Sequence, residues 1–292
     1  MIQTEVKDKL VLITGANSGI GKETARGLAA MGATIIMACR NLEKAEPVRD
    51  AIIEETGNEG VAVMHVDLAS LESIRTFARE FAATYANLDV LINNAGTFST
   101  TRQETEDGFE MTMGTNHLGP FLLTHLLLPH LMRAPAARIV NVGSEAAFFG
   151  KIDLNDLQMT KSYGMAGFRA YAASKLANVL FTQELAQRLE GTRATVTAVH
   201  PGEVNTNIWP DNNWFWRFVD RIQSRFRISA EEGARTVIFA ATSASLEGIT
   251  GKFLAEEQVK GVKGSCRDAS LQTALWQASE QLTGTMVSLW PL

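Results

Sequence analysis

Tyr171 and Lys175 lie four positions apart in the stretch AYAASKLAN, whose other residues are small or helix-forming. Four positions make about one helical turn, so the two side chains project from the same helix face and their polar ends can meet around one ligand. Of the three tyrosines in the chain, only Tyr171 is followed by a lysine at this spacing. An ammonium group near a phenol stabilises the phenolate and lowers a pKa that starts near about 10, which makes Tyr171 a candidate general acid or base.

Ser144 and Asn116 are two further polar residues at places where chemistry is expected. Ser144 stands in VNVGSEAA, directly after an apolar run that predicts a strand. The carboxyl ends of strands in an open α/β sheet form the edge where ligands bind. Asn116 stands in TNHLG, inside a long segment of helical period, where a short polar side chain is unfavourable on a packed face. Both residues are therefore candidates to act with Tyr171.

The elements that must position these residues alternate between short apolar runs and longer amphipathic segments. Most of the runs are continuously apolar, which is typical of strands covered on both faces. Strand, helix and strand repeated in this way predict right-handed crossovers and one parallel sheet with helices on each side. The predicted strands are 9–14, 33–38, 61–66, 89–93, 137–143, 194–200 and 252–256, and the predicted helices are 22–31, 42–55, 71–85, 109–131, 172–189 and 230–241.

The expected fold class is therefore α/β, a Rossmann-like doubly wound parallel sheet of about seven strands flanked by helices. No repeat, low-complexity tract or linker interrupts the pattern until the last 30 or so residues, where the periodicity weakens. A single domain over 1–292 is the expected organisation.

A glycine-rich turn follows the first predicted strand, in TGANSGIGKETARGLA. Gly15, Gly19 and Gly21 lie between the strand end and the helix start, where a tight turn lets backbone amides approach a pyrophosphate and the helix N-terminus favours its negative charge. The spacing is G-x-x-x-G-x-G rather than the commoner G-x-G-x-x-G. A glycine-rich turn without a ligand is the alternative, but its place in a strand–helix–strand unit favours a dinucleotide site.

Arg40 ends the second predicted strand, in MACRNLEKAE. A site that prefers NAD places an Asp or Glu there to accept from the ribose 2′-hydroxyl, whereas a 2′-phosphate needs a cation. The nearest carboxylate, Glu43, comes three residues later in the predicted helix. The sequence therefore predicts NADP(H), with Arg40 pairing the 2′-phosphate; a plain surface arginine is the alternative.

Residues after the third and fourth predicted strands extend this coenzyme site. Asp67 follows the third strand and is expected near the adenine. Asn93, Ala95 and Gly96, in INNAG, come at the end of the fourth strand and are expected to line the middle of the coenzyme. Each of these places also fits an ordinary turn.

Composition limits the partners of the chain. The net charge of −5 disfavours a nucleic-acid partner, because neutralising phosphates needs a clustered basic surface. The five histidines show no metal-ligand spacing, so no metal is expected. Two cysteines, a start without the order of a secretory signal, and the lack of an uninterrupted apolar run of about 18 residues together predict a cytoplasmic protein.

Taken together, the motifs resemble the short-chain dehydrogenase/reductase family. The matching pieces occur in the family's order over about residues 7–256: TGANSGIG, VDL at 66–68, NNAG, Asn116, Ser144, Tyr171-Ala-Ala-Ser-Lys175 and PG at 201–202. Within the family, ACRN, TNHLGPFLLTHLLLP, YAASKLANVLFTQELAQRL and VHPGEVNT are similar to the retinol dehydrogenase-like branch.

The resemblance implies a role for each matched residue. Tyr171 is implied to be the general acid for carbonyl reduction and the base for alcohol oxidation, while Lys175 holds the nicotinamide ribose and lowers the tyrosine pKa. Ser144 is implied to hydrogen-bond the substrate oxygen, and Asn116 to position a water that connects Lys175 to solvent. A loop with Pro201, Gly202 and Thr206 is implied to hold the nicotinamide carboxamide. With the residues above, the expected coenzyme-binding set is Gly15, Asn17, Ser18, Gly19, Ile20, Gly21, Arg40, Asp67, Leu68, Asn94, Ala95, Gly96, Tyr171, Lys175, Pro201, Gly202, Val204 and Thr206.

The implied activity is NADP(H)-dependent interconversion of a lipophilic aldehyde or ketone and its alcohol by hydride transfer. A non-catalytic NADP(H)-binding redox sensor is the alternative. The resemblance also implies a homodimer or homotetramer, because the predicted helices 109–131 and 172–189 have leucine-rich second faces that the family commonly pairs between subunits.

Two stretches are expected to choose the substrate. The first, 148–169, lies between Ser144 and Tyr171 and carries Phe148, Met159, Tyr163 and Met165. The second, 207–227, holds three of the five tryptophans and has arginines every four residues beside an apolar face. We expect 207–227 to be a lid over a bulky hydrophobic substrate; the same pattern also fits a peripheral membrane contact or a subunit contact.

Overall fold

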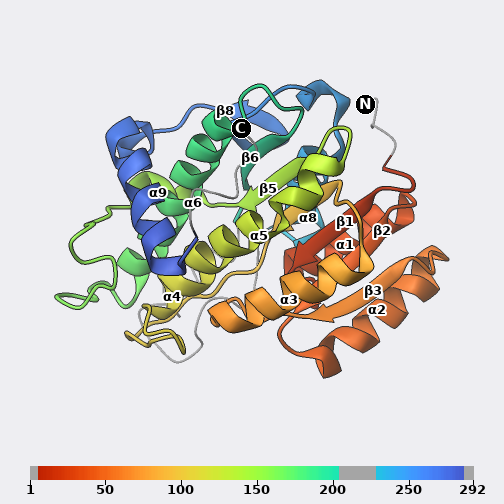
Figure 1. Ribbon diagram of the computed structural model, residues 1–292, viewed down its shortest axis with the longest axis horizontal. Coiled ribbons are helices and arrows are strands. Elements are labelled where there is room, and N and C mark those ends of the chain that lie inside the picture. The colour runs from red at the N-terminus through yellow and green to blue at the C-terminus, as the bar shows by residue number, and fades with distance from the viewer. Residues whose placement is uncertain (1–5, 204–227, 286–292) are drawn as a thin grey trace.

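An eight-stranded sheet forms the centre of the protein, in a computed structural model that describes residues 6–203 and 228–285 (Figure 1). The strand order is β3-β2-β1-β4-β5-β6-β7-β8, and all neighbouring pairs are parallel except β7 with β8. The strands are β1 (Leu10–Thr14), β2 (Thr34–Cys39), β3 (Val61–His65), β4 (Val90–Asn93), β5 (Arg138–Val142), β6 (Thr195–His200), β7 (Lys252–Ala255) and β8 (Gln258–Lys260). The chain runs from β1 outward to β3 and then returns to β4 on the other side of β1. This reversal is the switch point at which doubly wound sheets bind ligands.

The expected Rossmann-like fold is confirmed, with one strand more than the sequence predicted. β8 has only three residues and pairs antiparallel with β7 through a turn at Glu256 and Glu257, whose φ angles are 53° and 56°. So short and polar a segment gives no periodic signal.

Helices cover both faces of the sheet, which explains why the strands are apolar throughout. Val11 and Ile13 of β1 pack with residues of α1, α2 and α8, whereas Leu12 packs with residues of α3, α5 and α6. All three strand side chains are fully buried. The helices are α1 (Gly19–Ala30), α2 (Leu42–Thr56), α3 (Leu71–Thr84), α4 (Met111–Met113), α5 (Gly119–Arg133), α6 (Phe168–Arg188), α8 (Ala230–Thr242) and α9 (Ala269–Thr283).

The helix predicted at 109–131 is not uniform. A π-helical turn, Gly114–Leu118, joins α4 to α5 and contains Asn116. Such turns arise as local bulges in α-helices and often stand at functional sites. Pro120 follows Asn116 by four positions and has no N–H, so it cannot make the α-helical hydrogen bond to the Asn116 carbonyl.

The helix α9 lies where the sequence showed only weak periodicity, and it packs along α6 (Figure 1). Its Trp276 is 2% exposed; the ring lies 5.0 Å from that of Phe121 and 5.9 Å from that of Phe181, with the Arg188 guanidinium 4.3 Å from the ring centre. Trp276 of α9 thus packs, within the same chain, against the apolar faces of α5 and α6 that were expected to pair between subunits.

Candidate active site

A cavity of about 940 Å³ runs along the carboxyl ends of the central strands. It is lined by seventeen of the predicted site residues: Gly15, Asn17, Ser18, Gly19, Ile20, Gly21, Arg40, Asp67, Leu68, Asn94, Ala95, Gly96, Ser144, Tyr171, Lys175, Pro201 and Gly202. Asn116 lies behind the wall, whereas Val204, Thr206 and the whole of the predicted lid 207–227 lie outside the described residues.

The glycine-rich turn leaves the start of α1 open toward the cavity. Gly15 has a φ of +67°, and a Cβ there would lie 3.0 Å from the Cα and Cβ of Ala95. A Cβ on Gly21 would lie 2.5 Å from Asn94 Nδ2. The N-cap residue Ser18 makes no side-chain cap hydrogen bond, and the first turn of α1 has no acidic residue. Free backbone N–H groups and the positive end of a twelve-residue helix together fit a pyrophosphate.

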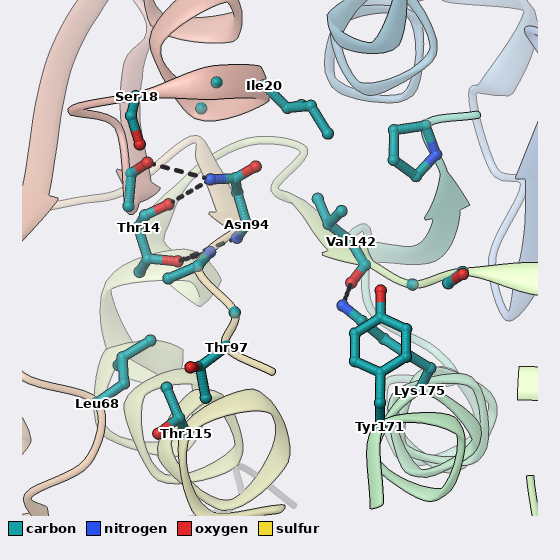
Figure 2. A pocket seen from close by; sticks show the side chains of 18 of the residues that line it. Thr14, Ser18, Ile20, Leu68, Asn94, Thr97, Thr115, Val142, Tyr171 and Lys175 are labelled. Carbon is teal, nitrogen blue, oxygen red and sulfur yellow. Dashed lines mark hydrogen bonds between the residues drawn. The ribbon is translucent and has the colours of Figure 1, made fainter. Parts of the chain in front are cut away.

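Asn94 holds this turn in place (Figure 2). Its Nδ2 donates to the carbonyls of Thr14 and Gly15, at 2.8 and 3.3 Å, while the backbone N–H groups of Asn94 and Ala95 both donate to Thr14 Oγ1 at 3.0 Å. Asn94 is therefore a brace between β1 and β4 at the cavity wall.

The expectation that Asn93 lines the cavity is wrong. This side chain is buried, and its Nδ2 donates to Thr124 Oγ1 and Asn141 Oδ1, at 3.0 and 2.8 Å. Successive side chains of a strand point to opposite faces, so Asn93 and Asn94 cannot both face the coenzyme site.

Two cations lie at the end of the cavity beyond β2. Arg40 is exposed, and its guanidinium forms no ion pair with any described residue. Asn41 and Lys44, which were not predicted from the sequence, also line the cavity. Asn41 caps α2, its Oδ1 accepting from Lys44 N at 2.9 Å, and so places Lys44 in the first helical turn. An asparagine three positions before a lysine at a helix start was the signal available for this placement. Glu43 is not among the lining residues.

Tyr171 and Lys175 meet at the other end of the cavity, on one face of α6 (Figure 2). Lys175 Nζ donates to Val142 O at 2.9 Å and lies 5.6 Å from the centre of the Tyr171 ring. Burial lowers the pKa of Lys175 to about 8. Burial likewise raises the pKa of Tyr171 to about 12, and a hydrogen bond with Ser144 opposes that rise. The lowering of the tyrosine pKa by Lys175 stays a prediction; in this structure the net shift is a rise, because burial removes water from the phenol.

Asn116 connects two cavity-lining segments from behind. Its Oδ1 accepts from Thr97 N at 2.7 Å, and its Nδ2 donates to Thr97 O at 2.9 Å and to Ser174 Oγ at 3.0 Å. The side chain therefore ties the segment after β4 to α6. Gly96 lies between Asn116 and Lys175: a Cβ there would be 3.4 Å from Asn116 Oδ1 and 3.8 Å from Lys175 Nζ.

The far wall of the cavity differs from the one that the sequence predicted. Phe148, Met159, Tyr163 and Met165 do not line it. Phe148 instead packs on Phe253, with ring centres 5.2 Å apart, and Met165 is 68% exposed. Two other residues of the predicted stretch 148–169, Phe149 and Phe168, do line this end. The remaining lining residues here were not predicted: Met111, Thr115, Glu145, His200 and Glu203. Phe148 and Phe149 end a 3₁₀ turn, Glu145–Phe149, and the sequence does not show which of these two neighbouring aromatic residues faces the cavity.

Within the described ranges, no helix is long and apolar enough to cross a membrane. The same ranges contain no group of three or more His, Cys, Asp or Glu residues that could hold a metal ion.

Comparisons with known proteins agree with this geometry. The sequence model of the short chain dehydrogenase family matches residues 9–156 and 157–214. Human retinol dehydrogenases 11 and 12 are 44% and 45% identical to the chain over 280 residues, covering 96% of it and 87% and 88% of their own lengths. A solved structure from Mycobacterium paratuberculosis is 38% identical, with a TM-score of 0.80 over 100% of this chain and 98% of its own. A short chain dehydrogenase from Escherichia coli, solved with NADPH, is 26% identical, with a TM-score of 0.68 over 86% of this chain and 98% of its own.

Proposed function

The chain belongs to the short-chain dehydrogenase/reductase family, the oxidoreductases of CH–OH and C=O groups, and from that premise we propose that it is an NADP(H)-dependent enzyme for lipophilic substrates. It interconverts an aldehyde or ketone with its alcohol. The observation that best supports this proposal is that Ser144, Tyr171 and Lys175 line the same cavity as the open N-terminus of α1.

NADP(H) is the proposed coenzyme because of the charges along the cavity. The N-terminus of α1 would hold the pyrophosphate, and Arg40 and Lys44 would hold a 2′-phosphate at the end of β2. Two solved relatives contain NADPH or NADP, which supports this assignment. When bound, the coenzyme supplies or accepts the hydride.

Tyr171 manages the proton in the proposed mechanism. Because burial raises its pKa to about 12, the phenol keeps its proton near neutral pH and can give it to the oxygen of a carbonyl undergoing reduction. Ser144 would hydrogen-bond the same oxygen and so orient the carbonyl. Lys175 would hold the ribose.

Asn116 would act through its backbone. Its side-chain amide is already bonded to Thr97 and Ser174, whereas its carbonyl has no N–H donor four positions on, because Pro120 stands there. This carbonyl is the acceptor that could hold a water beside Lys175.

A lipophilic substrate is proposed from the apolar side chains of Met111, Phe149 and Phe168 around the far wall. The human relatives carry the name of retinol, which is a lipophilic alcohol. Peripheral membrane contact through 207–227 and a cytoplasmic location stay predictions. A homodimer or homotetramer also stays a prediction, and it would need a face other than the one that α9 covers; light scattering gives the mass that tests it.

NADPH consumption, followed by near-ultraviolet absorbance, tests the proposed function. The substrates are a series of aldehydes and ketones from small aliphatic to retinal-sized, with wild type and Tyr171→Phe compared side by side. We expect consumption that rises with the apolar size of the carbonyl and is lost in Tyr171→Phe. Binding of NADPH without consumption, in this direction and with alcohols and NADP⁺ in reverse, would favour the redox sensor instead.

A further inference from the structure

Tyr163 stands in the long segment before α6, and its hydroxyl lies in a polar contact that the proposed reaction does not use. The oxygen is 3.0 Å from both Ser99 O and Glu110 Oε1, either of which can accept its one proton, and 3.4 Å from Thr112 Oγ1. Tyr163 is thus bonded away from the cavity, to the segment that follows β4.

Glu110, on the other side of this contact, is fully buried. Its Oε1 accepts from Thr112 N at 2.8 Å and its Oε2 from Met113 N at 2.7 Å, at the start of α4. No described lysine or arginine pairs with it. Among the described residues, the hydroxyl of Tyr163 is therefore the one side-chain donor to a carboxylate that otherwise bonds to backbone N–H groups. Hydrogen bonds to a buried charged acceptor are among the stronger ones.

A second pair of contacts joins the same two segments. Gln158 accepts through Oε1 from Glu110 N at 2.6 Å and through its backbone carbonyl from Arg102 Nε at 2.9 Å. The segment 150–167 is therefore fixed to the segment 97–110 at two places, Gln158 and Tyr163.

The backbone after Tyr163 needs this restraint. Met165 and Ala166 have φ angles of 58° and 47°, and Gly167 has a φ of 86°. Left-handed conformations cost about 1–2 kcal/mol for a residue with a Cβ, and they persist where surrounding contacts fix them. Gly167 also lies so close to Ser99 O that a Cβ would overlap that oxygen. Its own carbonyl accepts from Tyr171 N at 3.0 Å and so opens the first turn of α6.

The contact lies between the two walls of the substrate end of the cavity. Glu110 precedes Met111 and Thr115 on one wall, and Tyr163 precedes Phe168 and Tyr171 on the other. We propose that Tyr163 is a positioning residue: by bonding to Glu110 and Ser99 it sets the distance between these walls, and with it the size of carbonyl substrate that reaches Tyr171. This inference rests on the proposed function.

Tyr163→Phe is the direct test, because it removes only the hydroxyl. We expect kcat/KM for the bulkiest good substrate to fall about tenfold, the factor that a lost hydrogen bond to a charged acceptor gives, and the preference between small and large carbonyls to change. The Kd for NADPH should stay the same, because the contact is remote from Gly15, Arg40 and the rest of the coenzyme end. Tyr85→Phe is the matched control, because Tyr85 is also half-buried but lies at the C-terminal end of α3, outside the cavity lining.

Gly167→Ala disturbs the contact between 97–110 and 150–167 in a second way, because the added Cβ would overlap Ser99 O. Gly191→Ala is its control, because Gly191 has nearly the same φ, 85°, but a Cβ there would meet nothing within 4 Å. Gly167→Ala should change the substrate preference in the same direction as Tyr163→Phe, and Gly191→Ala should not.

Hydrogen exchange provides a readout that needs no turnover. Tyr163→Phe should speed exchange in 97–110 and 150–167 while leaving 14–30 unchanged, even if no carbonyl in the series is reduced and the proposed function fails. If Tyr163→Phe matches Tyr85→Phe in exchange and in substrate preference, or if NADPH affinity falls as much as kcat/KM, the positioning role is refuted.

Discussion

Replacing Arg40 by alanine should remove most of the preference for NADPH over NADH. Arg40 is exposed, so its interaction with a phosphate is set by a water-like dielectric, in which two unit charges 4 Å apart attract by about 1 kcal/mol. A 2′-phosphate carries nearly two negative charges, which gives about 2 kcal/mol. That energy corresponds to a factor of about 30 in the ratio of the two kcat/KM values. Arg40→Asp replaces this attraction with repulsion, so it should lower the ratio of kcat/KM for NADPH to that for NADH by more than this factor. The nearby Lys44 should limit the fall in that ratio.

The assay compares kcat/KM for NADPH and NADH at low and at physiological salt. Screening shortens the reach of exposed charges to about 8 Å at 0.15 M, so the wild-type preference should shrink as salt rises, and Arg40→Ala should lose that salt dependence. Arg79→Ala is the control, since Arg79 is exposed on α3 and pairs with Glu72 outside the cavity. Equal use of NADH by wild type, or an unchanged ratio in Arg40→Asp, would show that the end of β2 does not choose the coenzyme.

Three further outcomes are expected. Burial lowers the pKa of Lys175 from 10.5 to about 8, so between these pH values the unfolded chain holds a proton that the folded chain has lost, and the free energy of unfolding should rise with pH. The slope, at most about 1.4 kcal/mol per pH unit, should appear in urea unfolding as the difference between wild type and Lys175→Met; no difference between their slopes would contradict the burial of this amine. Trp276→Ala should lower the free energy of unfolding by about 3–5 kcal/mol, because α9 loses its largest buried side chain, and a loss under 1 kcal/mol by the same method would mean that α9 does not pack as described. Asn94→Asp would set a carboxylate against the carbonyls of Thr14 and Gly15, and calorimetric titration should show NADPH binding weakened by about tenfold or more; an unchanged Kd would mean that Asn94 does not brace the turn.

Local sequence was sufficient to predict the sheet and most of the residues at the coenzyme end of the cavity. The strands are apolar on both faces because helices cover both faces, and this pattern needs no tertiary information. Gly15, Gly21 and Arg40 were predictable because their places, just after β1 and β2, follow from the order of the elements along the chain. Lys44 was also predictable from the sequence, since its position depends on one helix cap, that made by Asn41.

The substrate end could not be predicted in the same way. Phe148 and Phe149 are neighbours in the chain, and no local rule shows that the first packs on Phe253 while the second lines the cavity. The helix α9 carries apolar residues at helical spacing, among them Leu271, Leu275 and Leu282. That spacing does not show which helix they pack on, and the fit of Trp276 beside Phe121 and Phe181 depends on the tertiary structure.

The sequence by itself determined which groups are available: a tyrosine and a lysine one helical turn apart, a serine at a strand end, and glycines where a phosphate must approach. Only the tertiary structure decided their chemical state. Burial is a property of the whole fold, and it raises the pKa of Tyr171 although the sequence suggested that Lys175 would lower it. Likewise, Tyr163 was predicted to face the substrate, but the fold places its hydroxyl against Glu110, fifty-three positions earlier in the chain, because contacts at that separation are fixed by how the elements pack.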